Sequence, residues 1–238
     1  MITLIWPTVR PLIAYQNASR WVGLATDASQ LEIWFGVNSD ADRKILIDAE
    51  TVKPLSFCPR FCLFRDARPG ITDTVTQMTL QVCQRTGDDS DIVVLASDDF
   101  DCSPGWDEHL RNQYAFGWSG ALIANDKYAQ STNIIPLPIL SVACLKRLNG
   151  IVYSPFYSHF FSDQEFFDVC VELKLIKNLR GTDAPRFTHQ HWTFNSARQR
   201  DKFDERNTTW WDRDKATYER RKKMPVEEKL KLPDWWLQ

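Results

Sequence analysis

Short apolar runs alternate with longer amphipathic segments through the N-terminal half of the chain. Residues 2–6, 31–37 and 91–96 are apolar runs too short for helices, so we expect buried strands there. The last run is apolar on both sides, as in a central strand that is covered on both faces. Residues 11–25 and 71–85 repeat apolar side chains at helical spacing. Strand, helix and strand at this spacing predict an α/β fold, with a parallel sheet and helices on its faces.

The pattern is less regular elsewhere. Pro54, Pro59 and Pro69 interrupt residues 50–70, which we interpret as irregular, and residues 38–42 read as a polar turn. Further along, the pattern predicts both helices and strands. We expect helices at 106–114, 139–148 and 162–173, and strands at 119–124 and 133–140.

The C-terminal tail differs in composition from the rest. Between Arg198 and Lys223 it carries ten Lys or Arg and six Asp or Glu, a net charge of +4, so the remainder carries −6. Thr209-Trp210-Trp211-Asp212 resembles a capping box that opens a helix to about Lys223, and Pro225 begins a shorter helix. The Trp pairs suggest an arm that folds back onto the main domain. It is either a solvated helix anchored by its aromatic rings or a dedicated binding arm.

Composition narrows the class of protein. The 238 residues are 43% hydrophobic and 25% charged with a net charge of −2, which is ordinary globular usage. No apolar run is long enough for a membrane-spanning helix, and the N-terminus lacks the basic start of a signal peptide. The six cysteines are scattered through apolar context, as buried reduced thiols are. We therefore expect a soluble, cytoplasmic protein with no membrane partner.

Three carboxylates directly follow the predicted strand at 91–96. Asp98, Asp99 and Asp101 would stand at its carboxyl end, where open α/β sheets bind ligands. Clustered carboxylates repel one another unless a cation neutralises them, and oxygen ligands favour Mg²⁺ or Mn²⁺. In extended geometry Asp99 and Asp101 point one way and Asp98 the other, so one carboxylate or two could bind the ion. The alternative is a solvated acidic turn.

Two of the four histidines stand at His189 and His191. In an extended segment their imidazoles project on one side, and one or both could complete the coordination of the same ion. A pair of ordinary surface or core histidines is the alternative. The sequence has no P-loop, no dinucleotide-binding glycine motif and no nucleophile elbow. A metal that bridges a departing diphosphate is the chemistry that remains, because an ion with few protein ligands is typically completed by substrate phosphates.

The order of these features resembles the GT-A glycosyltransferases, specifically family two. In that family the acidic motif at the strand end is commonly followed by Pro-Gly-Trp, as it is here at Pro104-Gly105-Trp106. The resemblance covers residues 1–195 and implies a mixed, mostly parallel sheet flanked by helices. Residues 1–101 would form the nucleotide-sugar half and 102–195 the acceptor half. Residues 196–238 would be a helical, Trp-rich basic tail, similar to that of small bacterial and phage members.

The resemblance also implies roles at the donor. Asp98 would lie near the ribose, and Asp99 would bind the Mn²⁺ or Mg²⁺ ion that bridges the diphosphate, with Asp101 as a possible helper. Asn38 or Asp40 would contact the base, although the family form has two acids before a Gly-Ser and the chain departs from it. The other nucleotide-sugar-binding residues that it implies are Pro7, Thr8 and Arg68.

A second motif, Ser162-Asp163-Gln164-Glu165, matches the Glu-Asp pair of the family, with Ser162 in place of the Glu. By that match Asp163 is the general base that removes a proton from the acceptor hydroxyl. From its residues alone, Asp163 could equally be a helix N-terminal carboxylate that the dipole stabilises. His191 or His189 matches the C-terminal metal ligand. A single base without a carboxylate nucleophile fits inversion of the sugar.

The implied partners are a nucleotide-sugar donor, with UDP as the family-weighted choice, and an acceptor that is either a glycan or small molecule or a hydroxymethylated base in phage DNA. The basic tail, with its Trp side chains, could supply cations for phosphates and rings for stacking. Two other functions use similar residues. One is a metal-dependent phosphoesterase or nuclease. The other is a non-enzymatic polyanion-binding module, in which Cys58 and Cys62 join His189 and His191 in a structural zinc site.

Overall fold

The computed structural model describes residues 1–55, 60–63, 70–85, 88–126, 133–181, 186–190 and 201–236, with the backbone alone at 60–63. Within these residues a seven-stranded sheet has the order β3-β2-β1-β4-β7-β6-β8. Each neighbouring pair is parallel except the two that β7 makes with β4 and β6. This confirms the mixed, mostly parallel α/β sheet. Its strands are β1 (Ile2–Pro7), β2 (Leu31–Val37), β3 (Arg60–Leu63), β4 (Ile92–Leu95), β6 (Ala121–Ile123), β7 (Ile139–Ser141) and β8 (Ile176–Asn178).

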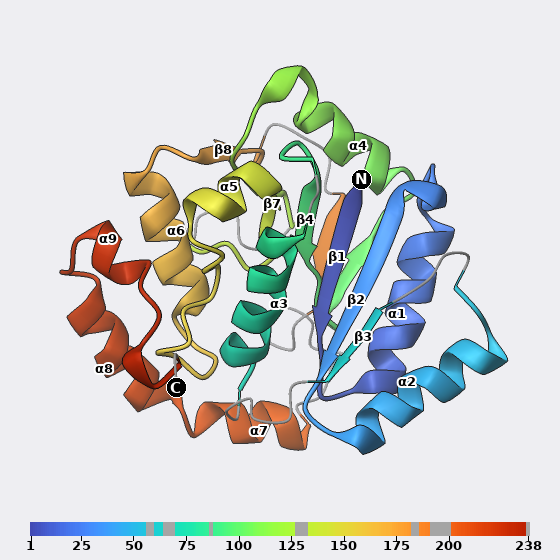
Figure 1. The fold of residues 1–238 in the computed structure, drawn as a ribbon, viewed down its shortest axis with the longest axis horizontal. Coiled ribbons are helices and arrows are strands. Elements are labelled where there is room, and N and C mark those ends of the chain that lie inside the picture. The colour runs from blue at the N-terminus through green and yellow to red at the C-terminus, as the bar shows by residue number, and fades with distance from the viewer. Residues whose placement is uncertain are drawn as a thin grey trace.

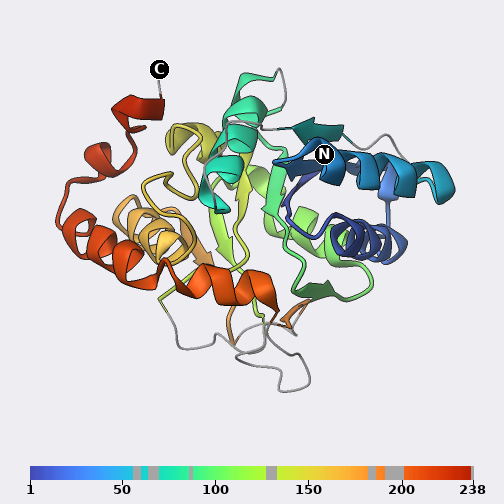
Figure 2. The ribbon, with the colours of Figure 1, turned by 90° about the horizontal axis from the view of Figure 1, so that it is seen from below.

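Helices cover both faces of the sheet (Figures 1 and 2). One face carries α1 (Pro11–Gly23), α2 (Asp40–Val52) and α4 (Trp106–Gln113). The other carries α3 (Thr72–Gln84), α5 (Val142–Arg147) and α6 (Ser162–Glu172). The tail adds four short elements, with α7 lying across the edge where β1 and β2 end (Figure 1). They are α7 (Lys202–Thr208), α8 (Trp211–Arg221), α9 (Val226–Lys229) and η3 (Asp234–Trp236).

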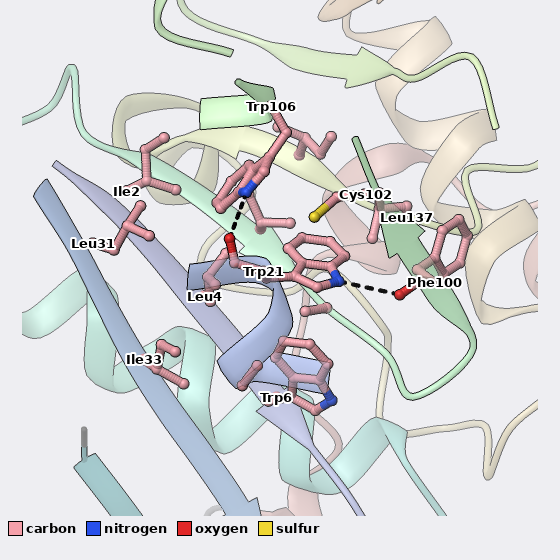
Figure 3. Close-up of a cluster of buried hydrophobic side chains, with 14 of the residues drawn as sticks. Ile2, Leu4, Trp6, Trp21, Leu31, Ile33, Phe100, Cys102, Trp106 and Leu137 are labelled. Carbon is pink, nitrogen blue, oxygen red and sulfur yellow. Dashed lines mark hydrogen bonds between the residues drawn. The ribbon is translucent and has the colours of Figure 1, made fainter. Parts of the chain in front are cut away.

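The alternation of side chains along β1 builds two cores. Ile2, Leu4 and Trp6 face α1 and α4, while Ile5 faces α3, because successive side chains of a strand point to opposite faces. The first core is aromatic, and its indole N–H groups are satisfied internally (Figure 3). Trp21 Nε1 donates to the carbonyl of Phe100 at 3.1 Å, and Trp106 Nε1 donates to that of Trp21 at 2.9 Å. The chain has ten Trp residues, and those buried in this core have a structural role.

Gly36 lets α3 pack directly on β2. A Cβ atom at this position would stand 2.5 Å from Met78 Sδ and 2.8 Å from Thr74 Cγ2. This close packing holds the N-terminal part of α3 near the carboxyl end of β2, where Thr74 contacts Asn38.

A separate antiparallel ribbon joins β5 (Phe100–Cys102) to β9 (Phe187–His189). In its register Phe100 lies opposite His189 and Asp101 opposite Thr188. The ring of Phe100 stacks on that of His189, with centroids 4.3 Å apart. The ribbon therefore brings the first histidine of the His-x-His motif to the acidic segment after β4. His191 lies outside the described residues.

The tail is fixed to the main body by buried polar contacts. Asp214 of α8 is 0% exposed and accepts the backbone N–H groups of residues 158, 159 and 160 at 2.9 to 3.2 Å. Arg221 donates two hydrogen bonds of 2.9 Å to Glu165 of α6, and both side chains are buried. The arm that the Trp pairs suggested thus folds back, and it is held by these charge-assisted hydrogen bonds together with Val226 and Leu230, which pack in the second core.

Several sequence predictions were wrong in detail. Residues 40–52 form α2 and residues 60–63 form β3. Of the strand expected at 133–140 only residues 139 and 140 lie in a strand, and the helix expected at 139–148 is confined to 142–147 because 139–141 form β7. The capping box expected at Thr209 is absent, since Trp210 caps α8 without a side-chain bond. A capping box instead opens α7, where Asp201 and Asp204 bond each other's backbone N–H groups. Among the described helices, none combines the length and apolar content needed to span a bilayer.

Candidate active site

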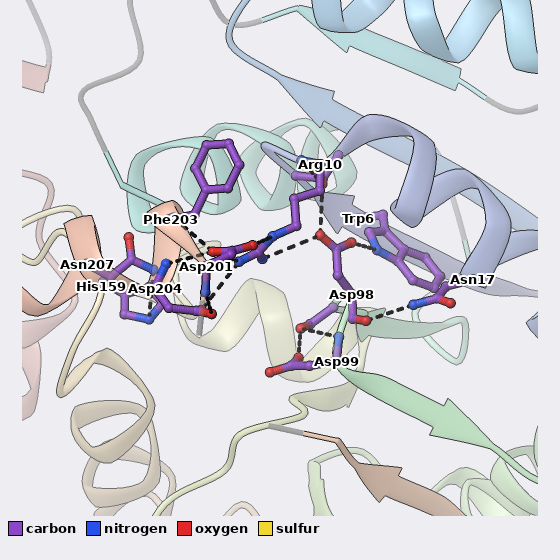
Figure 4. A network of polar contacts seen from close by, with 12 residues as sticks. Trp6, Arg10, Asn17, Asp98, Asp99, His159, Asp201, Phe203, Asp204 and Asn207 are labelled. Atoms are coloured by element: carbon purple, nitrogen blue, oxygen red, sulfur yellow. Dashed lines mark hydrogen bonds and ion pairs between the residues drawn. The ribbon is translucent and has the colours of Figure 1, made fainter. Parts of the chain in front are cut away.

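A cavity opens at the carboxyl ends of β1, β2 and β4, the edge where open α/β sheets bind ligands. Five residues that the sequence singled out line it, and segments from α3, the loop before α6, and α7 complete its wall. The five are Pro7, Thr8, Asn38, Asp98 and Asp99. The polar side chains around it form one network, which includes Arg10 and Asp204 (Figure 4).

Asp98 is anchored to the end of β1. Its carboxylate accepts hydrogen bonds from Trp6 Nε1 at 3.0 Å and Thr8 Oγ1 at 3.1 Å, and the Arg10 guanidinium lies 3.9 Å away. Burial raises the pKa of the Asp98 carboxyl to about 6, although these hydrogen bonds and the charge of Arg10 act in the opposite direction. Asp98 is therefore held rigidly at the wall of the cavity.

Asp99 and Asp101 have different partners. The Asp99 carboxylate lies 3.2 Å from His189 Nε2 and also contacts the hydroxyl of Ser97. Asp101 forms an ion pair with Arg20 at 2.7 Å and does not line the cavity. The three carboxylates, although close in sequence, thus have separate partners: Asp98 contacts the end of β1, Asp99 contacts His189, and Asp101 contacts α1.

The donor atoms beside the cavity fit a divalent ion. Asp99 and His189 offer a carboxylate and an imidazole within contact distance, a set suited to Mn²⁺, and such ions commonly take only a few protein ligands. Three carboxylates line the cavity against two guanidiniums, so a bound diphosphate would need a further positive charge. Among the described residues no group of three His, Cys, Asp or Glu side chains is gathered as for a metal, and His191 lies outside them.

The structure distinguishes the two residues, Asn38 and Asp40, that were predicted as alternative contacts for the nucleotide base. Asn38 lines the cavity, and its Oδ1 accepts a hydrogen bond from Thr74 Oγ1 at 3.0 Å. Asp40 is exposed at the first position of α2 and is not among the lining residues. Arg68 lies outside the described residues. Asn38 is therefore the better placed of the two alternatives.

Asp163 is the second residue of α6. Its Oδ1 accepts the N–H of Gln164 at 2.9 Å. Burial raises the pKa of Asp163, while that hydrogen bond and the charge of His189 partly oppose the rise. The charges of Asp163 and Asp99 both act on the pKa of buried Tyr153, which burial raises well above its usual value. Asp163 is not among the residues that line the cavity.

Sequence reasoning missed the cationic side chains of this site. Arg10, just before α1, donates to Asp201 through two bonds of 2.8 Å and to Asp204 at 3.3 Å, which ties α7 to β1. Arg206 and Asn207 of α7 also line the cavity. For Arg206 the sequence signal is the charged stretch from Arg198 to Lys223, whose cations are expected above to meet nucleic-acid phosphates.

No protein-family model matches the chain, and no curated protein matches its sequence. Solved structures do match its fold. S. aureus TarS 1–349 in complex with UDP-GlcNAc has a TM-score of 0.60 at 14% identity, covering 85% of this chain and 60% of that one. The mannosyltransferase PcManGT from Pyrobaculum calidifontis, in complex with GDP-Man and Mn²⁺, has a TM-score of 0.56 at 14% identity over 74% and 53%. M. tuberculosis glucosyl-3-phosphoglycerate synthase has a TM-score of 0.54 at 11% identity over 87% and 78%.

The chain spans between 36% and 60% of the first three structures that it matches. At these identities the likeness concerns the fold. The chain therefore has the fold of the GT-A glycosyltransferases.

Proposed function

We propose that this protein is a metal-dependent glycosyltransferase that moves a sugar from a nucleotide-diphosphate donor to an acceptor hydroxyl. The observation that carries the proposal is the pair Asp98 and Asp99 at the end of β4, in a cavity of a GT-A fold. Structures with this fold bind UDP-GlcNAc or GDP-Man, the latter with Mn²⁺. UDP is the donor nucleotide that we propose for this chain.

The residues of the cavity suit the parts of such a donor. Asn38, beside Thr74, can present its amide to the base, and Asp98 can accept hydrogen bonds from the ribose hydroxyls. Arg10 and Arg206 can bind the diphosphate, because guanidinium groups match phosphate oxygens in geometry and charge. Asp99 and His189 would hold the ion, which, when bound, stabilises negative charge on the leaving oxygen.

Asp163 is proposed as the base. The charge of His189 acts on its carboxyl group, and the pKa that burial raises strengthens it as a proton acceptor once it is ionised. It would take the proton of the acceptor hydroxyl as that oxygen attacks the anomeric carbon from the face opposite the diphosphate. One such displacement inverts the sugar. The acceptor would be a glycan or small molecule, or a hydroxymethylated base in DNA.

The test compares UDP and GDP, with and without Mn²⁺, as stabilisers of the folded protein, and then measures nucleotide released from the matching sugar donors. A ligand at one hundred times its Kd stabilises by about 2.7 kcal/mol. We expect Asp99→Asn to lose the Mn²⁺-dependent part of this gain. Asp101→Asn is the matched variant, and should keep it because Asp101 contacts Arg20 outside the cavity.

Two results would oppose the proposal. One is a protein that no nucleotide diphosphate stabilises in the presence of Mn²⁺. The other is release of phosphate from simple phosphate esters without any transfer of sugar, which would favour a phosphoesterase.

A further inference from the structure

A second cavity, of about 290 Å³, lies directly beside the first. The two share a partition, because neighbouring residues of the same three segments line one or the other. In the segment at the start of α3, residues 70, 71 and 74 line the first cavity and 72 and 73 line the second. In the loop before α6, residue 159 lines the first cavity and residue 158 lines the second. Around the end of α7, residue 207 lines the first cavity and residue 210 lines the second. Trp235 of η3 also lines the second cavity, so the C-terminal element shares this cavity with the start of α3.

The wall of this second cavity is aromatic and electrically balanced. Four rings line it, from Phe156, Tyr157, Trp210 and Trp235. The charged side chains in the described lining are one carboxylate, Asp73, and one guanidinium, Arg213. Aromatic faces pack well against the C–H faces of sugar rings, and a carboxylate with a guanidinium can bond the hydroxyls at their edges.

Several of these side chains are held in place before any ligand arrives. The guanidinium of Arg206 lies 5.1 Å from the ring centre of Trp210, and that of Arg221 lies 4.3 Å from Phe156. Tyr157 donates its hydroxyl proton to Glu165 at 2.6 Å. A cavity whose rings are already positioned loses less conformational freedom when it binds, so its contacts contribute more fully to affinity.

Charge and size favour a neutral saccharide. A nucleic acid needs a surplus of cations beside its phosphates, and one acid against one base supplies none. The cavity lies at the lower end of the range for small-molecule sites, about 300 to 1,000 Å³. It therefore suits one or two sugar rings better than a polymer laid along the surface.

We propose that this second cavity binds a sugar ring of a neutral glycan, as the acceptor subsite of the transferase. The inference rests on the proposed function, and it narrows the acceptor to the saccharide class. Because neighbouring residues of the same three segments line the two cavities, a glycan that is held here and extends past this wall would present a further hydroxyl to the donor site.

The test uses Trp235 and Trp236, which are adjacent in η3 while Trp235 alone lines the cavity. Binding of cellohexaose, maltohexaose and chitohexaose to the full chain is measured by calorimetry without donor. We expect at least one to bind, with affinity reduced about tenfold by Trp235→Ala and less than about twofold by Trp236→Ala. Trp235→Phe, which keeps a ring, should retain most of the binding, and this shows that the loss is not a failure to fold.

The outcomes separate this inference from the proposed function. If UDP with Mn²⁺ stabilises the protein but none of the three oligosaccharides binds, the inference is overturned and the transferase stands. An equal loss in both Trp variants also overturns it. A single-stranded dT oligonucleotide that binds in a Trp235-dependent manner overturns it in favour of nucleic acid. Oligosaccharide binding without any nucleotide binding overturns the acceptor assignment together with the transferase.

Discussion

Replacement of Asp214 by alanine tests how far the tail supports the site. Asp214 is fully buried, and its carboxylate accepts N–H groups from Ser158, His159 and Phe160, at distances between 2.9 and 3.2 Å. These residues form the loop that enters α6, and His159 lines the cavity at the ends of β1, β2 and β4. Asp214→Ala would leave the three donors without their acceptor.

The size of the effect follows from these contacts. A buried donor that loses its acceptor costs about 1–3 kcal/mol, which gives an upper range of about 3–9 kcal/mol for three. Water can reach part of the loop, because the neighbouring Arg213 side chain is 58% exposed. We therefore expect Asp214→Ala to reduce the free energy of unfolding by about 3–5 kcal/mol, the range for breaking one partner from a buried charged contact. At about 2–4 °C per kcal/mol, Tm falls by about 6–20 °C.

Urea unfolding measures this loss, with Asp212→Ala as the matched variant. Asp212 is exposed on the same helix, so its replacement should change stability by no more than about 0.5 kcal/mol. Stabilisation by UDP with Mn²⁺ should also decrease in Asp214→Ala, because the loop that carries His159 is no longer fixed. Equal urea midpoints for the two variants would show that Asp214 does not organise this loop.

Three further predictions concern the base, the sheet and the attachment of α7. Asp163→Asn should lower kcat about 10²- to 10⁴-fold while UDP titrations show unchanged donor affinity, and an active variant would rule out the assignment as base. Gly36→Val should destabilise by about 1–3 kcal/mol, because its side chain would overlap α3. Gly23→Ala is the matched variant and should not destabilise the fold, because its Cβ atom would meet no atom within 4 Å. Equal urea midpoints for Gly36→Val and Gly23→Ala would contradict the packing argument. Arg10 holds the pKa of Asp201 well below its usual value, so their ion pair stabilises the fold above about pH 4 and is lost as the pH falls below that value. Stability measured against pH should therefore fall less steeply on the acid side in Asp201→Asn, and an unchanged slope would contradict the ion pair.

The central strands could be predicted from sequence because burial on both faces leaves a continuous apolar run. Residues 92–95 of β4 are all buried, and the expected strand at 91–96 is confirmed. Helix α2 escaped prediction for the opposite reason. Leu46 is its one buried residue, so the helix presents no apolar stripe. Strand β8 is half-exposed and three residues long, which is too short for an alternation to stand out.

The candidate site could be predicted only in the part that residues close together in the sequence form. The position of Asp98 and Asp99 after an apolar strand indicated the sheet edge at which the cavity lies. The contributions of Arg10 and Arg206 could not be foreseen, since they depend on α7 returning across that edge. The separation of Asp101 from Asp99 likewise depends on Arg20, the one charged side chain of α1, which lies 81 residues away in the sequence and meets Asp101 only in the folded chain.

The ribbon of β5 and β9 also bears on how the protein is made. Asp99 and His189 are 90 residues apart, and they meet only when β9 pairs with β5. Strands β1, β2 and β4 have already left the ribosome by then, since chains grow at about 5–20 residues per second and early segments can fold first. A nascent or prematurely terminated chain would thus carry the acidic segment without its imidazole partner. Binding of the proposed ion would then be one of the last events of biosynthesis, and the proposed function predicts that an unfinished product gains no stability from manganese.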